Sequence, residues 1–375
     1  MEFGIFNSVC MPPKFRAEHG AGAEHRRIQD EVRYVRAADA AGFKYAWVTE
    51  HHFLSEYSHL SASESFIGYA AAVTENIHLG SGIFNITPPV NHPARIAERV
   101  AMLDHLSEGR FEFGTGRGSS TTEQRGFGIE DPELTREMVA ETLPQIVRMW
   151  GAEEFSYDGK FFSMPTRNVL PKPYTDPHPP LWVAAGSPST FELAARQGLG
   201  VLCFAFGKPE TFTPLIEKYK KDIENCDPVG GFVNNNVMIT TQMLCLEDGG
   251  RARQVLRDID VGYYLSLVFR YLDTFPRPPG IPEWPATIPD QTIEQIDQQI
   301  KNRQIAVGDP DEVAATVQRF ADTGADQLSF GMLSSSMSIE TCEEAIATFG
   351  KHVLPQFDKE PVHSTTRQRQ AQVGS

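Results

Sequence analysis

The stretch YAWVTEHHF, from Tyr45 to Phe53, is an apolar run that stops at an acid and two adjacent imidazoles. Its first part is typical of a buried β-strand, which we place at Tyr45–Thr49. Glu50, His51 and His52 follow directly, so this titratable cluster lies at the carboxyl end of the strand. Reactive groups of parallel barrels gather at that end of the strands. The stretch therefore predicts a parallel strand whose carboxyl end carries chemistry.

Short apolar segments alternate with helical patterns through most of the chain. Eight βα units indicate a parallel sheet closed on itself, so we predict an α/β fold, a (β/α)8 TIM barrel. A doubly wound open sheet is the alternative. Besides Tyr45–Thr49, the predicted strands are Phe3–Phe6, Ile77–Phe84, Arg110–Gly116, Leu181–Ser187, Val201–Phe206, Asn236–Leu246 and Asp326–Met332.

The predicted barrel is a single domain over residues 1–360, with two segments that do not fit the repeat. The first, about 151–180, is expected to form an extra hairpin and loop. The second, about 261–302, lies between the seventh strand and the helix after it and contains TFPRPPGIPEWPATIP. Such a long insertion is either a functional lid or a disordered excursion. The polar tail, 361–375, is predicted to be disordered.

Composition excludes several classes of function. The formal charge of −15 offers no basic surface for nucleic acid or an anionic membrane. The 5 cysteines are scattered without a C-x-x-C pair, which argues against a disulfide framework and a zinc site. The amino-terminal residues show no secretory signal, and no apolar run is long enough to span a bilayer. We therefore expect a soluble cytoplasmic protein.

The two adjacent histidines have different expected roles. Neighbouring strand residues face opposite sides, so His51 and His52 cannot both point into the barrel mouth. This weakens any metal site that needs both imidazoles, and we predict no metal. One inward histidine suits acid–base chemistry near neutral pH. The alternative is a hydrogen-bonded histidine without a catalytic role.

A candidate phosphate site follows the fifth predicted strand, in AAGSPST, Ala184–Thr190. The free backbone N–H groups at the start of a helix bind anions, and Ser187 and Thr190 would add hydroxyl donors. Gly186 permits the close turn. The alternative is that Ser187 only caps the helix.

A third motif, FGTGRGSS at Phe113–Ser120, surrounds Arg117 with glycines directly after the fourth predicted strand. Glycine lets backbone approach a planar ligand, and arginine can bond phosphate or carbonyl oxygens. The spacing is not that of a Rossmann fingerprint, because no helix begins directly after it.

Together these stretches resemble the bacterial luciferase-like, flavin-dependent monooxygenases, including the luciferase α subunit. The resemblance covers nearly the whole barrel. It rests on MEFGIF at residues 1–6, EHHF at 50–53, HPARIAERVAMLDHLSEGRFEFGTGRG at 92–118, FGI at 127–129, VAAGSPSTFELAA at 183–195 and AVGDPDEV at 306–313.

The resemblance implies roles for particular residues. His51 matches the catalytic histidine beside the flavin, with Glu50 next to it, and Glu123 matches an acidic residue that influences flavin chemistry. Gly116 replaces the reactive cysteine of luciferase, and Gly186 replaces a glutamate. Gly82 and Ile83 match a non-prolyl cis peptide behind the isoalloxazine ring. The implied cofactor-binding residues are Gly82, Ile83, Arg117, Ala184, Gly186, Ser187 and Thr190.

The resemblance also implies a reaction. Reduced FMN, supplied by a separate flavin reductase, would react with O2 to form a flavin 4a-peroxide that oxygenates a hydrophobic small molecule. The insertion could exclude water, and His51 would manage a proton. Barrels of this family usually form homodimers.

Other functions remain open at this point. A deazaflavin-dependent dehydrogenase and a non-catalytic flavin-binding protein lie within the same superfamily, and a metal-dependent barrel hydrolase lies outside it. Aromatic side chains could line an apolar substrate pocket or belong to the core. They are Phe6, Phe204, Phe206, Tyr271 and Trp284.

Overall fold

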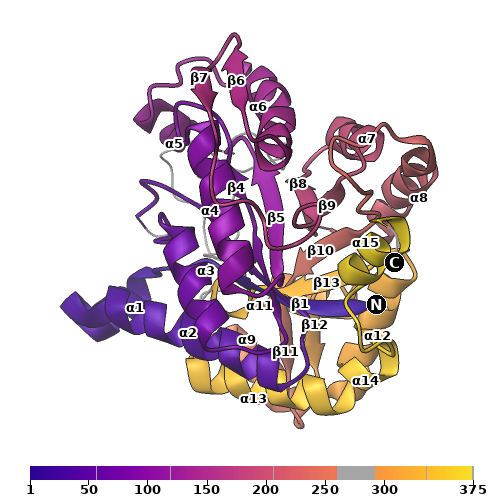
Figure 1. The fold of residues 1–375 in the computed structure, drawn as a ribbon. Coiled ribbons are helices and arrows are strands. Elements are labelled where there is room, and N and C mark those ends of the chain that lie inside the picture. Colours follow the sequence, from indigo (N-terminus) through magenta and orange to yellow (C-terminus); the bar gives the residue numbers. More distant parts are fainter. Residues whose placement is uncertain (56, 119, 206, 260–291, 335, 374–375) are drawn as a thin grey trace.

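A closed barrel of parallel strands forms the centre of the protein (Figure 1). The computed structural model describes residues 1–55, 57–118, 120–205, 207–259, 292–334 and 336–373. In these residues eight parallel strands follow the order β3-β2-β1-β13-β10-β9-β8-β5, and β3 pairs with β5 to close the ring. The predicted barrel is confirmed. Its strands are β1 (Glu2–Asn7), β2 (Tyr45–Val48), β3 (His78–Ser81), β5 (Phe111–Gly116), β8 (Leu181–Ala184), β9 (Gly200–Phe204), β10 (Val237–Thr241) and β13 (Gln327–Phe330).

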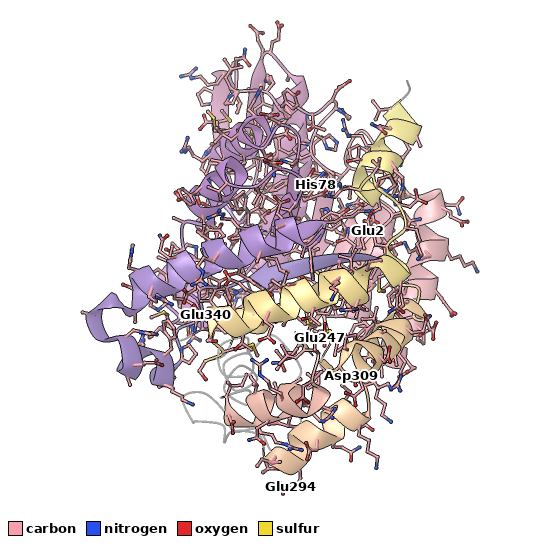
Figure 2. The ribbon with its side chains drawn as sticks, turned by 90° about the horizontal axis from the view of Figure 1, so that it is seen from below. Glu2, His78, Glu247, Glu294, Asp309 and Glu340 are labelled. Carbon is pink, nitrogen blue, oxygen red and sulfur yellow. The ribbon has the colours of Figure 1, made fainter. Side chains whose placement is uncertain are left out.

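Helices surround the barrel and cover its apolar strands. The residues Asp309-Pro310-Asp311-Glu312 are a typical helix start in sequence, and in the structure Asp309 and Glu312 form a capping box at the beginning of α12 (Asp309 is labelled in Figure 2). In the part of the chain that the structure describes, no helix is both long and apolar enough to cross a membrane. The helices are α1 (Pro13–His19), α2 (Ala23–Ala40), α3 (Ser63–Ala72), α4 (Pro93–Leu106), α5 (Thr121–Gly126), α6 (Leu134–Gly151), α7 (Pro188–Gln197), α8 (Thr213–Asp222), α9 (Gly249–Asp258), α11 (Ile293–Lys301), α12 (Pro310–Ala321), α13 (Ile339–His352), α14 (Leu354–Phe357) and α15 (Ser364–Val373).

Two predicted strands are each divided in the structure. The third segment forms β3 and β4 (Phe84–Asn85), with a cis peptide bond between Gly82 and Ile83, and β4 pairs with β5. The seventh forms β10 and β11 (Met243–Cys245), and β11 pairs with β12 (Ala306–Gly308) outside the barrel. A continuous apolar pattern does not reveal such breaks, because both pieces are buried.

The two insertions have different outcomes. The first contains the expected hairpin, formed by antiparallel β6 (Phe155–Asp158) and β7 (Ser163–Arg167). The second was placed wrongly, because α9 follows β11 and precedes the insertion. Its proline-dense part lies outside the described residues, and α11 forms its carboxyl-terminal end.

The barrel interior is filled by large aromatic side chains. Phe6, Tyr45, Trp47 and Trp182 pack with Leu202 and Met238, and the rings of Trp47 and Trp182 meet edge-on with centroids 5.0 Å apart. The interior is therefore a packed core rather than a channel.

The described part of the carboxyl-terminal tail, residues 361–373, contains the helix α15, so the prediction of disorder was wrong there. The yellow segment lies beside the strand that starts at Glu2 (Figures 1 and 2), and its helix α15 contributes buried Ser364 and Thr365. Ser364 donates from its backbone N and its Oγ to the Glu2 carboxylate, at 2.9 and 2.5 Å, and Thr365 Oγ1 donates to Glu112 Oε1 at 2.6 Å. These polar residues are held by buried polar partners, which a hydrophobicity pattern cannot show.

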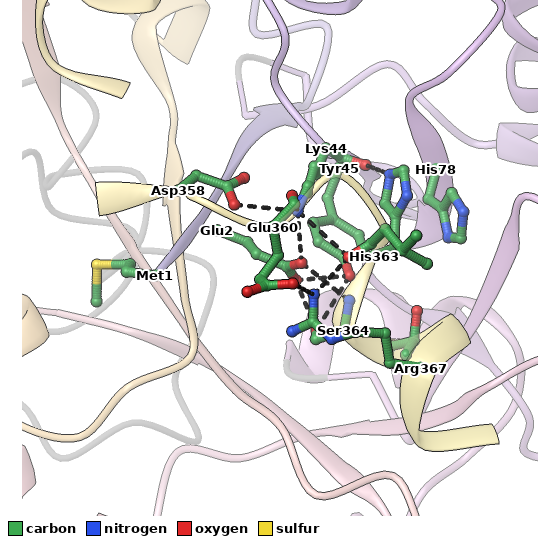
Figure 3. Close-up of polar contacts among 12 residues, drawn as sticks. Met1, Glu2, Lys44, Tyr45, His78, Asp358, Glu360, His363, Ser364 and Arg367 are labelled. Carbon is green, nitrogen blue, oxygen red and sulfur yellow. Dashed lines mark hydrogen bonds and ion pairs between the residues drawn. The ribbon is translucent and has the colours of Figure 1, made fainter. Parts of the chain in front are cut away.

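Buried charges and imidazoles make up the rest of this contact (Figure 3). Lys44 Nζ lies 2.9 Å from Glu2 Oε1 and 3.1 Å from Asp358 Oδ1. Burial would raise the pKa of Glu2, but the hydrogen bond from Ser364 and the charge of Lys44 lower it. The rings of His78 and His363 stack with centroids 3.7 Å apart.

The two stacked histidines and Glu112 are held neutral by burial. Burial, with the charge of Arg110, lowers the pKa of His78 to about 3, and burial next to His78 lowers that of His363 to about 3. Burial raises the pKa of Glu112, which faces His78 Nδ1 at 2.8 Å, to about 8. Two uncharged imidazoles can stack here, whereas two imidazolium ions would repel each other in a site where little water screens them.

We expect acidification to weaken the docking of the tail. As the pH falls below 6.5, the two histidines take up protons in the unfolded chain before they do so in the folded protein. The contribution of the two neutral rings to the free energy of unfolding is therefore complete above pH 6.5 and is lost progressively toward pH 3. His363→Phe keeps a flat ring against His78 but cannot be protonated. Between pH 7 and pH 5 it should lose about 1–2 kcal/mol less stability than the native chain, as measured by urea unfolding.

Exposed His25 on α2 provides the matched control. His25→Phe should leave the pH dependence of unfolding unchanged. An identical pH dependence in native protein and His363→Phe would contradict the role of the stacked pair.

Candidate active site

The carboxyl ends of four neighbouring strands bring the predicted site residues to one arc of the barrel rim. β2, β3, β5 and β8 are consecutive around the ring. The residues after them are His51, Gly82–Ile83, Arg117 and Ala184–Thr190. Because parallel strands end on one side of the barrel, segments more than a hundred residues apart share this rim.

His51 is held by a carboxylate from a short helix beyond β5. Its Nδ1 lies 3.1 Å from Glu123 Oε1, which also accepts the backbone N–H of His52 at 2.9 Å. Ser120 caps the helix α5 by accepting the backbone N–H of Glu123 at 3.1 Å. The His51 side chain is 14% exposed and that of Glu123 is 5% exposed, so the imidazole is the member of the pair that solvent reaches. The structure therefore pairs these two predicted catalytic residues.

His52 is held by the other predicted acid. Its Nε2 lies 3.2 Å from Glu50 Oε1, and the ring packs edge-on against Phe127 at 4.9 Å. The sequence places Glu50 beside His51, but in the structure each histidine contacts its own carboxylate.

Asn91 is a site residue that sequence reasoning missed. Its Nδ2 donates to Glu50 Oε1 at 3.0 Å and to the backbone oxygen of Asn85 at 2.8 Å. Asn91 precedes the HP motif at His92 and Pro93, where an asparagine is ordinarily read as a turn residue. The sequence holds no signal that it reaches Glu50, which is 41 residues away.

The backbone of Gly116 in β5 lies against the side chain of Ile83, which follows Gly82. A Cβ at Gly116 would lie 2.7 Å from both Cγ1 and Cδ1 of Ile83, so only glycine permits this approach. Ile83 and Phe204 are half-buried and pack against the aromatic interior, where the Phe6 and Phe204 rings are 5.0 Å apart. The rim thus has an apolar floor. Phe206, Tyr271 and Trp284, which were candidates for a substrate pocket, lie outside the described residues.

Arg117 lies half-buried after β5. Its guanidinium donates to Thr135 Oγ1 at 3.0 Å. Burial, together with the nearby positive charge of Arg136, lowers the pKa of Arg117. An anion or a carbonyl oxygen bound beside it would offset that cost, because arginine remains protonated in proteins.

Three hydroxyl groups meet at the amino end of α7. Ser187 Oγ lies 3.0 Å from Ser189 Oγ and 3.1 Å from Thr190 Oγ1. Ser187 occupies the N-cap position, but its side chain makes no capping hydrogen bond. Ala184 and Gly186 are exposed. A cluster of hydroxyls at the positive end of a helix is suited to an anion such as phosphate.

In the part of the chain that the structure describes, no three His, Cys, Asp or Glu side chains come together as metal ligands would. A hollow of about 400 Å³ lies between α7 and α8, and none of the predicted site residues lines it. Its lining is charged and polar: Glu192, Arg196, Lys218, Lys221, Asp222 and Asn225.

Comparison with known proteins establishes the family. Residues 1–327 match the luciferase-like monooxygenase family, which is most of the chain. The chain therefore belongs to that family.

Individual relatives differ in their cofactor. The chain is 24% identical to the oxygenase component of flavin-dependent trigonelline monooxygenase from Acinetobacter baylyi, over 90% of this chain and 92% of the relative. It is 31% identical to F420-dependent glucose-6-phosphate dehydrogenase from Beutenbergia cavernae, over 54% of this chain and 60% of that protein. Several other curated relatives are matched over only 54–56% of their length.

Among solved structures, the FMN complex of the oxygenating constituent of 3,6-diketocamphane monooxygenase from Pseudomonas putida is similar in fold. The TM-score is 0.76 at 20% identity, over 95% of this chain and 98% of that chain. At that identity the likeness supports the barrel fold and leaves the ligand of this chain open.

Proposed function

We propose that this protein is a flavin-dependent monooxygenase that uses reduced FMN and O2 to oxygenate a hydrophobic small molecule. A separate flavin reductase would supply the reduced FMN. The observation that carries the proposal is the placement of the His51–Glu123 pair on the same arc of the rim as the hydroxyl cluster of α7. Family membership supports it.

The side chains along this arc fit a flavin nucleotide. Ser187, Ser189 and Thr190 would hold the phosphate, where α7 presents its positive end. Ile83 and Gly116, which lies against it, would be near the ring system of the flavin. The backbone of Gly82, Ala184 and Gly186 would line the rim around the cofactor. Arg117 would offset negative charge or bond a carbonyl oxygen. Glu123 Oε2 is buried and has no hydrogen-bond partner among the described residues, so a donor can still be accommodated there.

When bound, reduced FMN would supply the electrons and the activation of oxygen. The protein would hold the cofactor in position and control the transfer of protons at the site. Because His51 Nδ1 faces Glu123, its Nε2 is the ring nitrogen left to take or give a proton. Phe6, Ile83 and Phe204 would keep water from the reacting atoms.

A second candidate is an F420-dependent dehydrogenase, which would transfer hydride without oxygen. The match to F420-dependent glucose-6-phosphate dehydrogenase favours it. A flavin-binding protein without turnover is a weaker candidate, since it would not need the His51–Glu123 pair. Fluorescence titration with reduced FMN and with the deazaflavin, followed by oxygen uptake, separates the three.

We expect the double variant Ser187→Ala/Thr190→Ala to bind FMN about 10–100-fold more weakly, because hydrogen bonds to a charged phosphate contribute about 1.5–3 kcal/mol. Riboflavin has no phosphate and serves as the matched control. Its dissociation constant should change less than about 3-fold. Parallel titrations measure both, and an equal loss for the two ligands would place the phosphate elsewhere.

We expect His51→Ala to bind FMN normally but to lose product formation by about 100-fold or more, because acid–base groups contribute that much. The assay is oxygen uptake with reduced FMN against a panel of hydrophobic aldehydes, ketones and alkenes, with product and hydrogen peroxide quantified. Oxygen should still be consumed and released as hydrogen peroxide. Undiminished product would remove His51 from the reaction, and no oxygenation of any substrate by the native protein would count against the proposal.

We further propose that two copies form a homodimer through α3 and α4. Tyr69 on α3 is 56% exposed, and Met102 and Leu106, four residues apart on one face of α4, are 49% and 55% exposed. Met102→Glu/Leu106→Glu should sediment as a monomer in analytical ultracentrifugation. Ile28→Glu, at an exposed apolar residue of α2, should remain dimeric; a native protein that sediments as a monomer would refute the dimer.

A further inference from the structure

Both polar atoms of the Asn91 side chain make hydrogen bonds. Its Oδ1 accepts from Arg99 NH2 at 2.6 Å, and its Nδ2 donates to Glu50 Oε1 at 3.0 Å and to the backbone oxygen of Asn85 at 2.8 Å. The residue lies in the turn between β4 and α4, where its backbone N–H bonds to the oxygen of Thr87 at 2.9 Å. The turn itself is thus closed by the backbone, and the side chain is available for another role.

The orientation of the Asn91 amide is determined by its partners. A guanidinium only donates, and a backbone carbonyl only accepts, so the oxygen must face Arg99 and the nitrogen must face Asn85. Arg99 is itself anchored, because its NH1 donates to Glu64 Oε1 on α3 at 2.8 Å. Its side chain is only 16% exposed. A rigid chain of bonds therefore runs from α3 through Arg99 and Asn91 to Glu50.

Glu50 depends on this anchor. Its Oε1 receives Asn91 Nδ2 and faces His52 Nε2 at 3.2 Å, whereas its Oε2 is buried without a hydrogen-bond partner in the described residues. Of the two described side chains that contact this carboxylate, Asn91 is the one without an ionisable group, so its hydrogen bond does not depend on pH. Without it, the Glu50 carboxylate could adopt other orientations, in which neither oxygen faces His52 Nε2.

The same amide ties two strand ends together. Asn85 belongs to β4, which follows the Gly82–Ile83 bond and pairs with Gly116 of β5. Glu50 follows β2. Asn91 therefore couples the acid beside His52 to the backbone segment proposed to lie beside the cofactor.

We propose that Asn91 is a positioning residue that orients the Glu50 carboxylate, and through it His52, so that Nε2 of His52 carries the hydrogen. Its effect on turnover rests on the monooxygenase function proposed above. Its effect on His52 does not, because these contacts exist in the protein alone.

Two substitutions of similar size separate hydrogen bonding from packing. Asn91→Asp can still accept from Arg99 but cannot donate to Glu50 or Asn85, and Asn91→Leu does neither. The primary measurement is ¹⁵N NMR of the His52 side chain in protein without cofactor, at a pH where the imidazole is neutral. The native protein should show the hydrogen on Nε2, and both variants should show a mixture of the two tautomers.

Turnover gives the second measurement. We expect kcat of both variants to fall about 10-fold or more while the FMN dissociation constant changes less than about 3-fold, since the change misplaces an acid–base pair and leaves the phosphate contacts intact. Arg99→Lys, which loses the fork that holds Asn91 and Glu64 together, should show a smaller change in the same direction. Arg95→Ala, at an exposed arginine of the same helix, should change neither kcat nor the FMN dissociation constant.

These measurements distinguish the two proposals. An unchanged His52 tautomer in folded Asn91→Asp and Asn91→Leu overturns the role of Asn91. If the Asn91 variants do not fold, the test passes to Arg99→Lys, and an unchanged His52 tautomer in that variant overturns the role of Asn91. A changed tautomer in a protein that oxygenates no substrate upholds the role of Asn91 and counts against the monooxygenase.

Discussion

The hydrogen bonds between β3 and β5 are the constraint on which the rest of the molecule depends. They pair Leu79 with Phe111 and Gly80 with Glu112, and they close the sheet into a ring. Closure requires glycine at two places. A Cβ at Gly80 would lie 2.3 Å from the Trp47 ring, and one at Gly114 would lie 1.9 Å from the backbone oxygen of Ser81. Because the ring is closed, the segments after β2, β3, β5 and β8 become neighbours on one rim.

Buried polar groups have different surroundings at the two ends of the barrel. At the amino end, burial holds His78, His363 and Glu112 in their neutral forms, and Thr365 of the tail donates a hydrogen bond to Glu112. At the carboxyl end, two buried carboxylates each keep one oxygen without a partner among the described residues, while the imidazoles beside them remain 14% and 17% exposed. The hydrogen bonds that join the tail to β1 and β5 at the amino end stabilise the fold. An end with open acceptors and reachable imidazoles is suited to bind and react.

Local patterns predicted much of this protein, and their failures have a common cause. The barrel, the Asp309 capping box and the β6–β7 hairpin follow from periodicity and turn chemistry. The tail was read as disordered because polar residues at a terminus usually are, yet Ser364 and Thr365 meet buried acids from β1 and β5. Glu50 was grouped with His51 because they are adjacent, although the backbone turns them to different partners. The buried partners of the tail lie 362 and 253 residues away in the chain, and the partner of His51 lies 72 residues away.

The sequence by itself determined the alternation of strands and helices that makes a barrel, that polar residues end the strands, and to which family the motifs belong. These properties depend on residues within a few positions of one another. Only the tertiary structure decided that His51 meets Glu123, 72 residues away, that Glu50 meets Asn91, and that Ser364 meets Glu2, 362 residues away. Such pairings depend on which strands become neighbours when the ring closes and on which polar groups then lose water, and no short stretch of sequence contains that information.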